Sequence, residues 1–256
     1  MNPGLYADSQ IELRYQSLAA DSRFFQFANI PDRIIECLRF YRIDGDMDRV
    51  RKVLLAYYLF IAVADDLIDG SLRGGGDSIL ARLANPFVCL NKEVACSDAE
   101  FLAEILKLHF PASTSMRIRS KLRRLYKISL QERRVCRMRA FVKTRMILGS
   151  VTADISYLLV RDHLVGDAPQ FRELMKHVGA VGCLVDSVVD GRNDQRAGLL
   201  PFRPSLIEWL FLYAQTFVVG MKIVWKYPRL MRLFFDAITD NVYDRRRSVP
   251  VQMASD

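Results

Sequence analysis

The chain has 256 residues, of which 51% are hydrophobic, so it is long and apolar enough to bury a substantial core. Its formal net charge of +8 suits a polyanionic partner, such as nucleic acid, anionic lipid or a phosphorylated small molecule. No groove-reading motif accompanies the basic residues, so we do not expect nucleic-acid binding. The five cysteines form no CxxC pair, so the spacing predicts neither a zinc site nor a disulfide framework.

Glycine and proline are scattered, and the sequence shows neither an internal repeat nor a low-complexity linker. We therefore predict one domain over residues 1–256, with residues 1–20 and 248–256 peripheral or flexible. Met1 to Gln10 lack the basic-then-apolar pattern of a secretory signal. We accordingly expect a cytoplasmic protein.

Helical periodicity dominates the chain, and alternating β-branched runs are absent, so the sequence predicts an all-α bundle. In chain order, helices are predicted over residues 53–69, 78–90, 99–109, 169–190, 204–225 and 228–246. A glycine-rich turn at 71–76 separates the first two. Residues 115–164 are predicted to form either one long helix or two helices with a kink near Gly149.

The apolar stretch from Leu206 to Trp225 is long enough to cross a bilayer. It contains Glu208, Gln215 and Lys222, however, and these polar groups disfavour a spanning segment. We expect a buried helix here, with peripheral contact to a membrane surface as the alternative.

Two acidic clusters interrupt these apolar helices. Together they comprise Asp65, Asp66, Asp69, Asp186, Asp190, Asn193 and Asp194. The first cluster ends the helix predicted at 53–69, and the second repeats aspartate every four residues, so its members share one helix face. Like charges at this spacing cost about 0.2–0.5 kcal/mol per pair. The clusters are therefore candidates for function. The alternative is a pair of solvated helix ends, marked by Gly70 and Gly191.

Oxygen ligands of this kind suit Mg²⁺, which is usually held by one or two carboxylates, phosphate and water. More than one ion around a single diphosphate would satisfy both clusters, and Mn²⁺ is an alternative. Arginine binds phosphate oxygens in a planar fork. The candidate diphosphate-binding residues are Arg23, Arg145, Arg192, Arg196, Arg245 and Arg246. A solvated surface position is the alternative for each.

The pattern resembles the class I isoprenoid synthases, most closely the squalene and phytoene synthase family. Asp65 to Gly70, "DDLIDG", resembles its first aspartate motif. Asp186 through Gly198 to Pro201 follows the spacing of its second motif, and Ser22-Arg23-Phe24 resembles its N-terminal element. This resemblance implies a helical bundle around a central apolar cavity. It also implies Mg²⁺-dependent ionisation of an allylic prenyl diphosphate, with Asp65, Asp69, Asp186 and Asp190 as the catalytic carboxylates.

The sequence departs from that family at two places. The tyrosines before its small-residue segment are missing here, where the run is Arg145 to Thr152, and Asn193 replaces an acidic residue. We therefore expect a terpene synthase that acts on one C15 or C20 substrate. Aromatic side chains would face the carbocation, and the candidates are Tyr57, Phe60, Tyr157, Phe211 and Phe217. Head-to-head condensation of two prenyl diphosphates, a non-catalytic partner subunit and a homodimer remain open.

Overall fold

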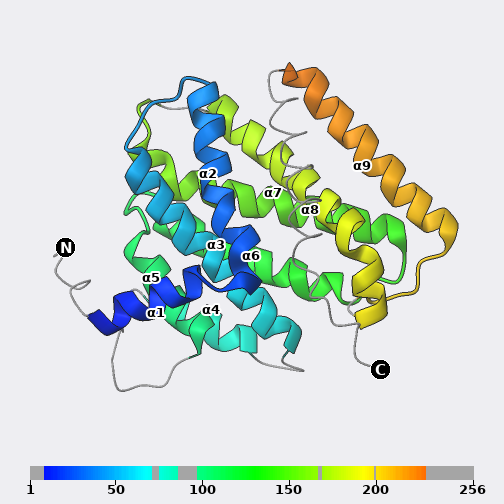
Figure 1. The fold of residues 1–256 in the computed structure, drawn as a ribbon, viewed down its shortest axis with the longest axis horizontal. Coiled ribbons are helices and arrows are strands. Elements are labelled where there is room, and N and C mark those ends of the chain that lie inside the picture. Colours follow the sequence, from blue (N-terminus) through cyan, green and yellow to red (C-terminus); the bar gives the residue numbers. More distant parts are fainter. Residues whose placement is uncertain (1–8, 71–74, 86–96, 167–168, 199, 229–256) are drawn as a thin grey trace, which may run out of the picture. The chain divides into compact units, whose positions relative to one another are not determined.

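The structure is a computed structural model that describes residues 9–70, 75–85, 97–166, 169–198 and 200–228. For residues 9–10, 68–70, 75 and 197, only the helical backbone is described. Within these ranges every regular element is a helix, apart from one isolated bridge between Gly45 and Leu164. The predicted all-α fold is therefore confirmed (Figure 1).

The chain divides into two compact units. The first unit comprises Met1–Lys127 and Asp154–Arg172, and the second comprises Ile128–Ala153 and Glu173–Asp256. Three helices contribute residues to both units: α6 (Ser115–Glu132), α7 (Met138–Val160) and α8 (Pro169–Ala197). The single domain predicted over residues 1–256 stays a prediction, as does the central cavity.

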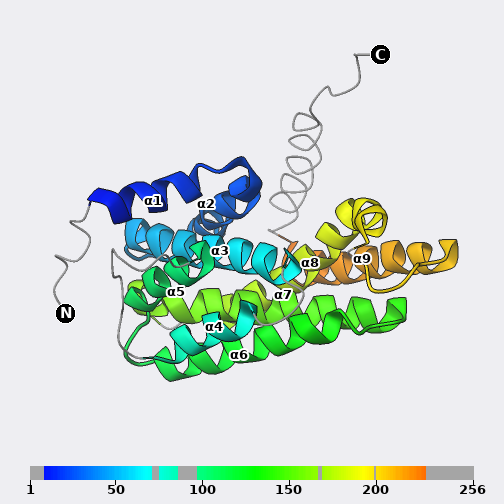
Figure 2. The ribbon, with the colours of Figure 1, turned by 90° about the horizontal axis from the view of Figure 1, so that it is seen from below.

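The first unit is built around α3 (Met47–Gly70), which α2 (Phe25–Phe40) and α5 (Asp98–Leu108) contact (Figure 2). A further helix, α4 (Gly75–Ala84), contacts both α3 and α5. The middle of α3 is buried because its apolar residues continue almost unbroken from Val53 to Ala64. A buried hydrogen bond from the Ser156 hydroxyl to the Tyr58 hydroxyl, 3.0 Å long, links α7 to α3.

The structure contains N-terminal helices that the sequence analysis did not predict. They are α1 (Ser9–Ala19), the short 3-10 helix η2 (Ser22–Phe24) and α2. Although proline removes a backbone donor and disfavours helix interiors, α2 continues through Pro31. Pro31 is buried together with Ile35 and Leu38, so it lies on the core-facing side of the helix. This burial offsets part of the cost of the missing hydrogen bond.

The second unit packs the N-terminal part of α7, most of α8, and α9 (Leu206–Lys226) around one apolar cluster. Its buried members come from all three helices: Met138, Phe141, Val142, Leu184 and Leu212. The chain enters α9 through Ser205, whose hydroxyl accepts a hydrogen bond from the Glu208 amide while the Glu208 carboxylate accepts one from the Ser205 amide. This capping box fixes the first turn of α9.

Residues 115–164 form two helices, as one of the two predictions allowed, but the kink predicted near Gly149 is wrong. The chain breaks at residues 133–137, and Gly149 lies inside an uninterrupted α7. The chain tightens at the end of α6, where the Val135 amide donates to the Glu132 carbonyl over 3.1 Å.

The remaining predicted helices lie close to the observed ones, with shifted ends. The helix predicted at 78–90 is observed only to Ala84, and residues 86–96 lie outside the described residues. The helix predicted at 169–190 continues to Ala197. The helix predicted at 228–246 also lies outside the description. The short η3 (Arg161–His163) precedes α8.

The prediction that α9 is buried is wrong. It is the one helix among the described residues that is long and apolar enough to cross a membrane by length and composition, yet only 17% of that stretch is buried. Leu212, Gly220 and Ile223 face the core. The opposite side is also apolar but stays exposed, because the described residues of the second unit pack against one side of the helix only.

Candidate functional site

The second acidic cluster lies on one continuous helix. α8 runs through Asp186, Asp190 and Asp194 to Ala197, and Gly198 follows with a φ of 73°, the left-handed conformation that glycine adopts readily at a helix end. Gly191 is therefore an interior residue and not a helix end. A Cβ at that position would lie 2.5 Å from the Trp209 ring, so the glycine allows α9 to approach α8.

Arg145 of α7 reaches the start of this cluster. Its guanidinium donates one hydrogen bond of 2.8 Å to an Asp186 carboxylate oxygen and another of 2.9 Å to the Ser187 hydroxyl. A third, longer contact of 3.4 Å joins it to the Glu132 carboxylate. The Arg145 side chain is 19% exposed and the Asp186 side chain 49% exposed. The Arg145 guanidinium thus has three hydrogen-bond partners, while the Asp186 carboxylate remains accessible to solvent.

The rest of the second cluster spreads along α8. Asp190 and Asp194 are half-buried, and Asn193 is exposed. Two of the candidate arginines, Arg192 and Arg196, are also exposed on this helix. The structure therefore gathers the oxygen donors of the second motif on a single helix, with Arg145 bound at its first aspartate.

The first cluster ends α3 in the first unit. Asp65 and Asp66 are exposed, and Asp69 lies in the helix, with its side chain outside the description. Arg23, in η2, approaches this cluster, with its guanidinium 3.8 Å from the Asp66 carboxylate. This is an ion-pair distance and longer than a hydrogen bond. The structure thus brings Arg23 toward the first cluster, and its binding of a diphosphate stays a prediction.

The Arg23 guanidinium is bound more closely to Asp21, at 2.7 Å. This hydrogen bond lowers the pKa of Asp21 and raises the pKa of Arg23. Asp21 also accepts a hydrogen bond from the Arg23 backbone amide, which caps the start of η2. Asp21 therefore orients Arg23 at the side of the cluster.

Oxygen is the only ligand atom that the two clusters offer, as Mg²⁺ requires. Within the described residues, no group of three or more His, Cys, Asp or Glu side chains forms a ready metal cage. Mg²⁺ commonly takes only one or two carboxylates from protein and the remainder from phosphate and water. The donor set in each unit fits that ion chemically.

The aromatic candidates fall into two groups. Tyr57, Phe60 and Tyr157 are buried in the first unit, as apolar core residues usually are. In the second unit Phe211 is half-buried under the Arg139 guanidinium, which lies 5.7 Å from the ring centre. Phe217 is 69% exposed, so it does not enclose an apolar space in this unit.

The sequence analysis did not nominate three residues that contact the candidate arginines: Asp21, Glu132 and Ser187. Asp21 carries a local signal, because aspartate two residues before an arginine at a helix start can cap the helix and bind the side chain. Glu132 and Ser187 carry none. They contact Arg145 from 13 and 42 residues away along the chain, through the turn at residues 133–137 and the packing of α7 against α8. Arg245 and Arg246 lie outside the described residues.

We compared the chain with protein-family models, with curated proteins and with solved structures, and no match was found in any of the three.

Proposed function

We propose that this protein is a class I terpene synthase, which ionises an allylic C15 or C20 prenyl diphosphate with Mg²⁺ and steers the cation to a cyclised or rearranged product. One observation supports this most strongly. Asp186, Asp190 and Asp194 repeat along a continuous helix, and the fork of Arg145 is bound at the first of them. A carboxylate stripe beside an arginine combines the groups that hold a metal-bound diphosphate.

Different residues would bind the metal ions and the diphosphate during ionisation. Asp65, Asp69, Asp186 and Asp190 would hold the metal ions, with Asp66, Asn193 and Asp194 as further oxygen ligands. Arg145 and Arg23 would donate hydrogen bonds to the diphosphate as negative charge develops on its leaving oxygen. When bound, Mg²⁺ or Mn²⁺ supplies positive charge that stabilises the departing diphosphate.

Asp186 and Asp66 suit this role because each carboxylate is solvent-exposed and already has an arginine beside it. Solvent exposure lets a hydrated ion reach them, and the arginines oppose the repulsion between neighbouring aspartates. Glu132 and Ser187 would be positioning residues, since they orient Arg145. Asp21 would do the same for Arg23. Arg192 and Arg196, exposed on α8, are further candidates for the diphosphate. We place this activity in the cytoplasm.

Head-to-head condensation of two prenyl diphosphates is the alternative reaction, since it begins with the same ionisation. We favour one substrate because the tyrosine-rich stretch of the condensing enzymes is replaced by residues 145–152. A non-catalytic subunit is disfavoured, since both clusters keep their carboxylates despite the cost of placing like charges along a helix.

The test is incubation of the purified protein with farnesyl or geranylgeranyl diphosphate and Mg²⁺, with release of diphosphate and the hydrocarbon product measured. We expect a product with the carbon number of its substrate and none in the presence of a chelator. A C30 or C40 product would establish condensation instead. Absence of diphosphate release from both substrates would contradict the proposal.

A matched pair of variants tests the site. Asp190→Asn keeps the size of the side chain and removes one proposed metal ligand, so diphosphate release should fall by at least ~100-fold, about 2.7 kcal/mol. Asp162→Asn makes the same chemical change at an exposed position of η3 outside both clusters. It should leave the rate within about two-fold. Equal rates of diphosphate release in both variants would show that Asp190 of the second cluster does not belong to the site.

A further inference from the structure

The side of α9 that faces away from the core is apolar and exposed. Its exposed fractions run from 47% for Met221 to 88% for Trp225, and the other main members are Leu206, Ile207, Leu210 and Phe217. At about 100° per residue, these six side chains fall within roughly 100° of the helix circumference. They form a continuous stripe, which we call the outer face of α9. Contiguous exposed apolar surfaces of this kind mark contact sites.

One edge of the outer face is basic. Lys222 and Lys226, both exposed, follow it about 60° to 100° further round the helix. Arg139 of α7 adds a third cation here, because its guanidinium covers the Phe211 ring. The one carboxylate in α9, Glu208, accepts hydrogen bonds from Ser205 in the capping box. The helix therefore offers apolar side chains bordered by positive charge.

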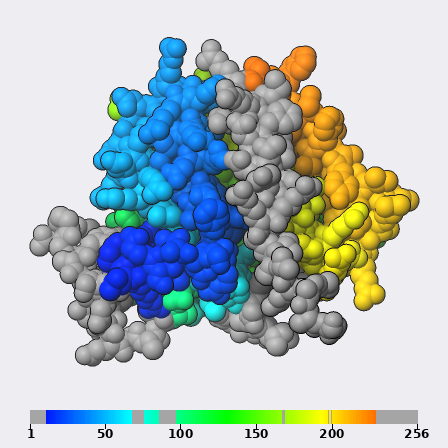
Figure 3. Space-filling model, in the orientation of Figure 1, coloured from blue at the N-terminus to red at the C-terminus, as the bar shows by residue number. Residues whose placement is uncertain are grey.

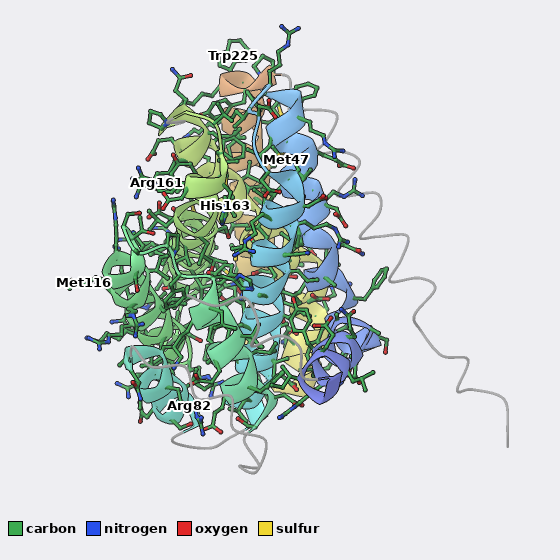
Figure 4. All side chains as sticks on the ribbon, turned by 90° about the vertical axis from the view of Figure 1, so that its left-hand side faces the viewer. Met47, Arg82, Met116, Arg161, His163 and Trp225 are labelled. Atoms are coloured by element: carbon green, nitrogen blue, oxygen red, sulfur yellow. The ribbon has the colours of Figure 1, made fainter. Side chains whose placement is uncertain are left out.

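We propose that the outer face of α9 docks onto the surface of an anionic lipid bilayer, with the helix lying in the plane of the interface. Interfacial helices combine an apolar side with basic residues that attract anionic headgroups. Trp225 projects from the end of the helix, where a tryptophan would lie at headgroup depth (Figure 4). The inference does not depend on the proposed function.

The helix docks without crossing the bilayer, although its length and composition would allow a span. Leu212 is fully buried in the cluster with Met138, Phe141, Val142 and Leu184, and Ile223 is also buried. A spanning helix would have to expose these core contacts to lipid. A flat orientation keeps them and places only the outer face in the bilayer. Figure 3 shows α9, in orange, on the visible face of the molecule.

Charge favours lipid over a second copy of the chain. Each copy carries a net charge of +8, and a two-fold contact through the outer face would bring two basic edges together. An anionic bilayer meets the same edge with opposite charge. The two occupants also respond differently to experiment, since only lipid binding depends on the headgroup.

The test uses the full-length protein without prenyl diphosphate or Mg²⁺, so its result is independent of catalysis. Flotation with vesicles of phosphatidylcholine and phosphatidylglycerol should recover the wild type, and neutral phosphatidylcholine vesicles should bind it at least ten-fold more weakly. The variant Leu210→Glu/Phe217→Glu should bind anionic vesicles at least ten-fold more weakly than the wild type. Lys222→Glu/Lys226→Glu should lose the preference for anionic lipid.

A matched control is Leu13→Glu/Met116→Glu. It also introduces two glutamates in place of exposed apolar side chains, in α1 and α6, at 69% and 86% exposure. In Figure 4, Met116 projects outward from α6. The control should bind vesicles like the wild type. Trp225 provides a second readout, because its emission should shift to the blue on anionic vesicles and the shift should vanish in Trp225→Phe.

Three results would overturn the proposal. Equal binding of the outer-face variant and the control would assign lipid contact to another surface. A wild type that fails to float but dimerises, with monomers from Leu210→Glu/Phe217→Glu, would assign the outer face to a second copy. A wild type that neither floats nor dimerises would mean that another partner covers the face. Thermal unfolding of each variant verifies that it is folded.

Discussion

Gly149 of α7 and Gly179 of α8 lie backbone to backbone. A Cβ on either glycine would overlap the carbonyl oxygen of the other. The two helices can approach this closely only where both residues lack a side chain. Arg145 lies one helical turn before Gly149, and it contacts Asp186 and Ser187 two turns beyond Gly179. The glycine contact therefore sets the helix spacing that allows Arg145 to reach the second acidic cluster.

Replacing Gly149 by alanine should destabilise the protein, because the added methyl group must push α7 and α8 apart. We expect a loss of about 1–3 kcal/mol in the free energy of unfolding, measured by urea denaturation. The control is Gly182→Ala in α8, where a Cβ would meet no atom within 4 Å. This variant should be neutral or stabilising by up to ~1 kcal/mol, since alanine favours helix. Equal stability of the two variants would contradict the close contact.

Replacing Arg145 by lysine should lower the rate of diphosphate release while leaving the fold intact. Lysine keeps the positive charge but has no planar fork to bind Asp186, Ser187 and a phosphate oxygen together. We expect kcat to fall by about 10–100-fold, or about 1.4–2.7 kcal/mol in the barrier. Arg134→Lys, at an exposed position in the turn after α6, is the matched control and should keep kcat within about two-fold. An unaltered kcat in Arg145→Lys would show that Arg145 does not contribute to diphosphate release.

Asp154 of α7 accepts hydrogen bonds from Arg172 at 2.6 Å and forms an ion pair with Lys121 at 2.5 Å. Its side chain is 5% exposed. Asp154→Asn leaves both cations without this charge, so we expect a loss of about 1–3 kcal/mol in unfolding free energy. That is less than the ~3–5 kcal/mol of a fully buried pair, because the two cations remain partly exposed. Asp32→Asn, which breaks an exposed pair with Arg51, should cost at most ~1 kcal/mol.

The same aspartate predicts a loss of stability in acid. Burial alone would raise the pKa of Asp154, but the hydrogen bonds and charges of Arg172 and Lys121 outweigh it and lower the pKa below 3.8. A lowered carboxyl pKa adds stability that is present above about pH 4 and is lost as the pH falls through the folded-state pKa. Urea denaturation at pH 6 and pH 3 should therefore show a smaller decrease for Asp154→Asn than for the wild type. Equal decreases would show that the ion pair does not control acid stability.

His109, which follows α5, predicts a separate transition at higher pH. Burial lowers the pKa of its imidazole from 6.5 to about 4, with smaller contributions from Arg49 and His163. The unfolded chain therefore binds a proton that the folded protein excludes, and stability should decrease as the pH falls from about 6.5 to about 4. His109→Gln should flatten this part of the profile. The slope of the unfolding free energy against pH stays below ~1.4 kcal/mol per pH unit, because a single imidazole exchanges at most one proton.

The positions of α3 and α8 follow largely from local sequence. The apolar run from Val53 to Ala64 and the aspartate repeat on α8 specify their helices through periodicity, which depends only on near neighbours along the chain. The oxygen-rich composition of the two clusters is equally a property of sequence. It is enough to nominate the ligands of a metal-bound diphosphate, but it does not show which arginine stands beside them.

Contacts between distant residues were decided by tertiary structure. Helical periodicity does not predict that Gly191 packs against the Trp209 ring, or that Arg145 contacts Glu132 across the turn after α6. The exposure of α9 is the clearest case. Its largely apolar sequence predicts burial, yet the described residues of the second unit pack against one side only. Hydrophobicity is a property of each side chain, whereas burial depends on the other elements that the folded chain places against it.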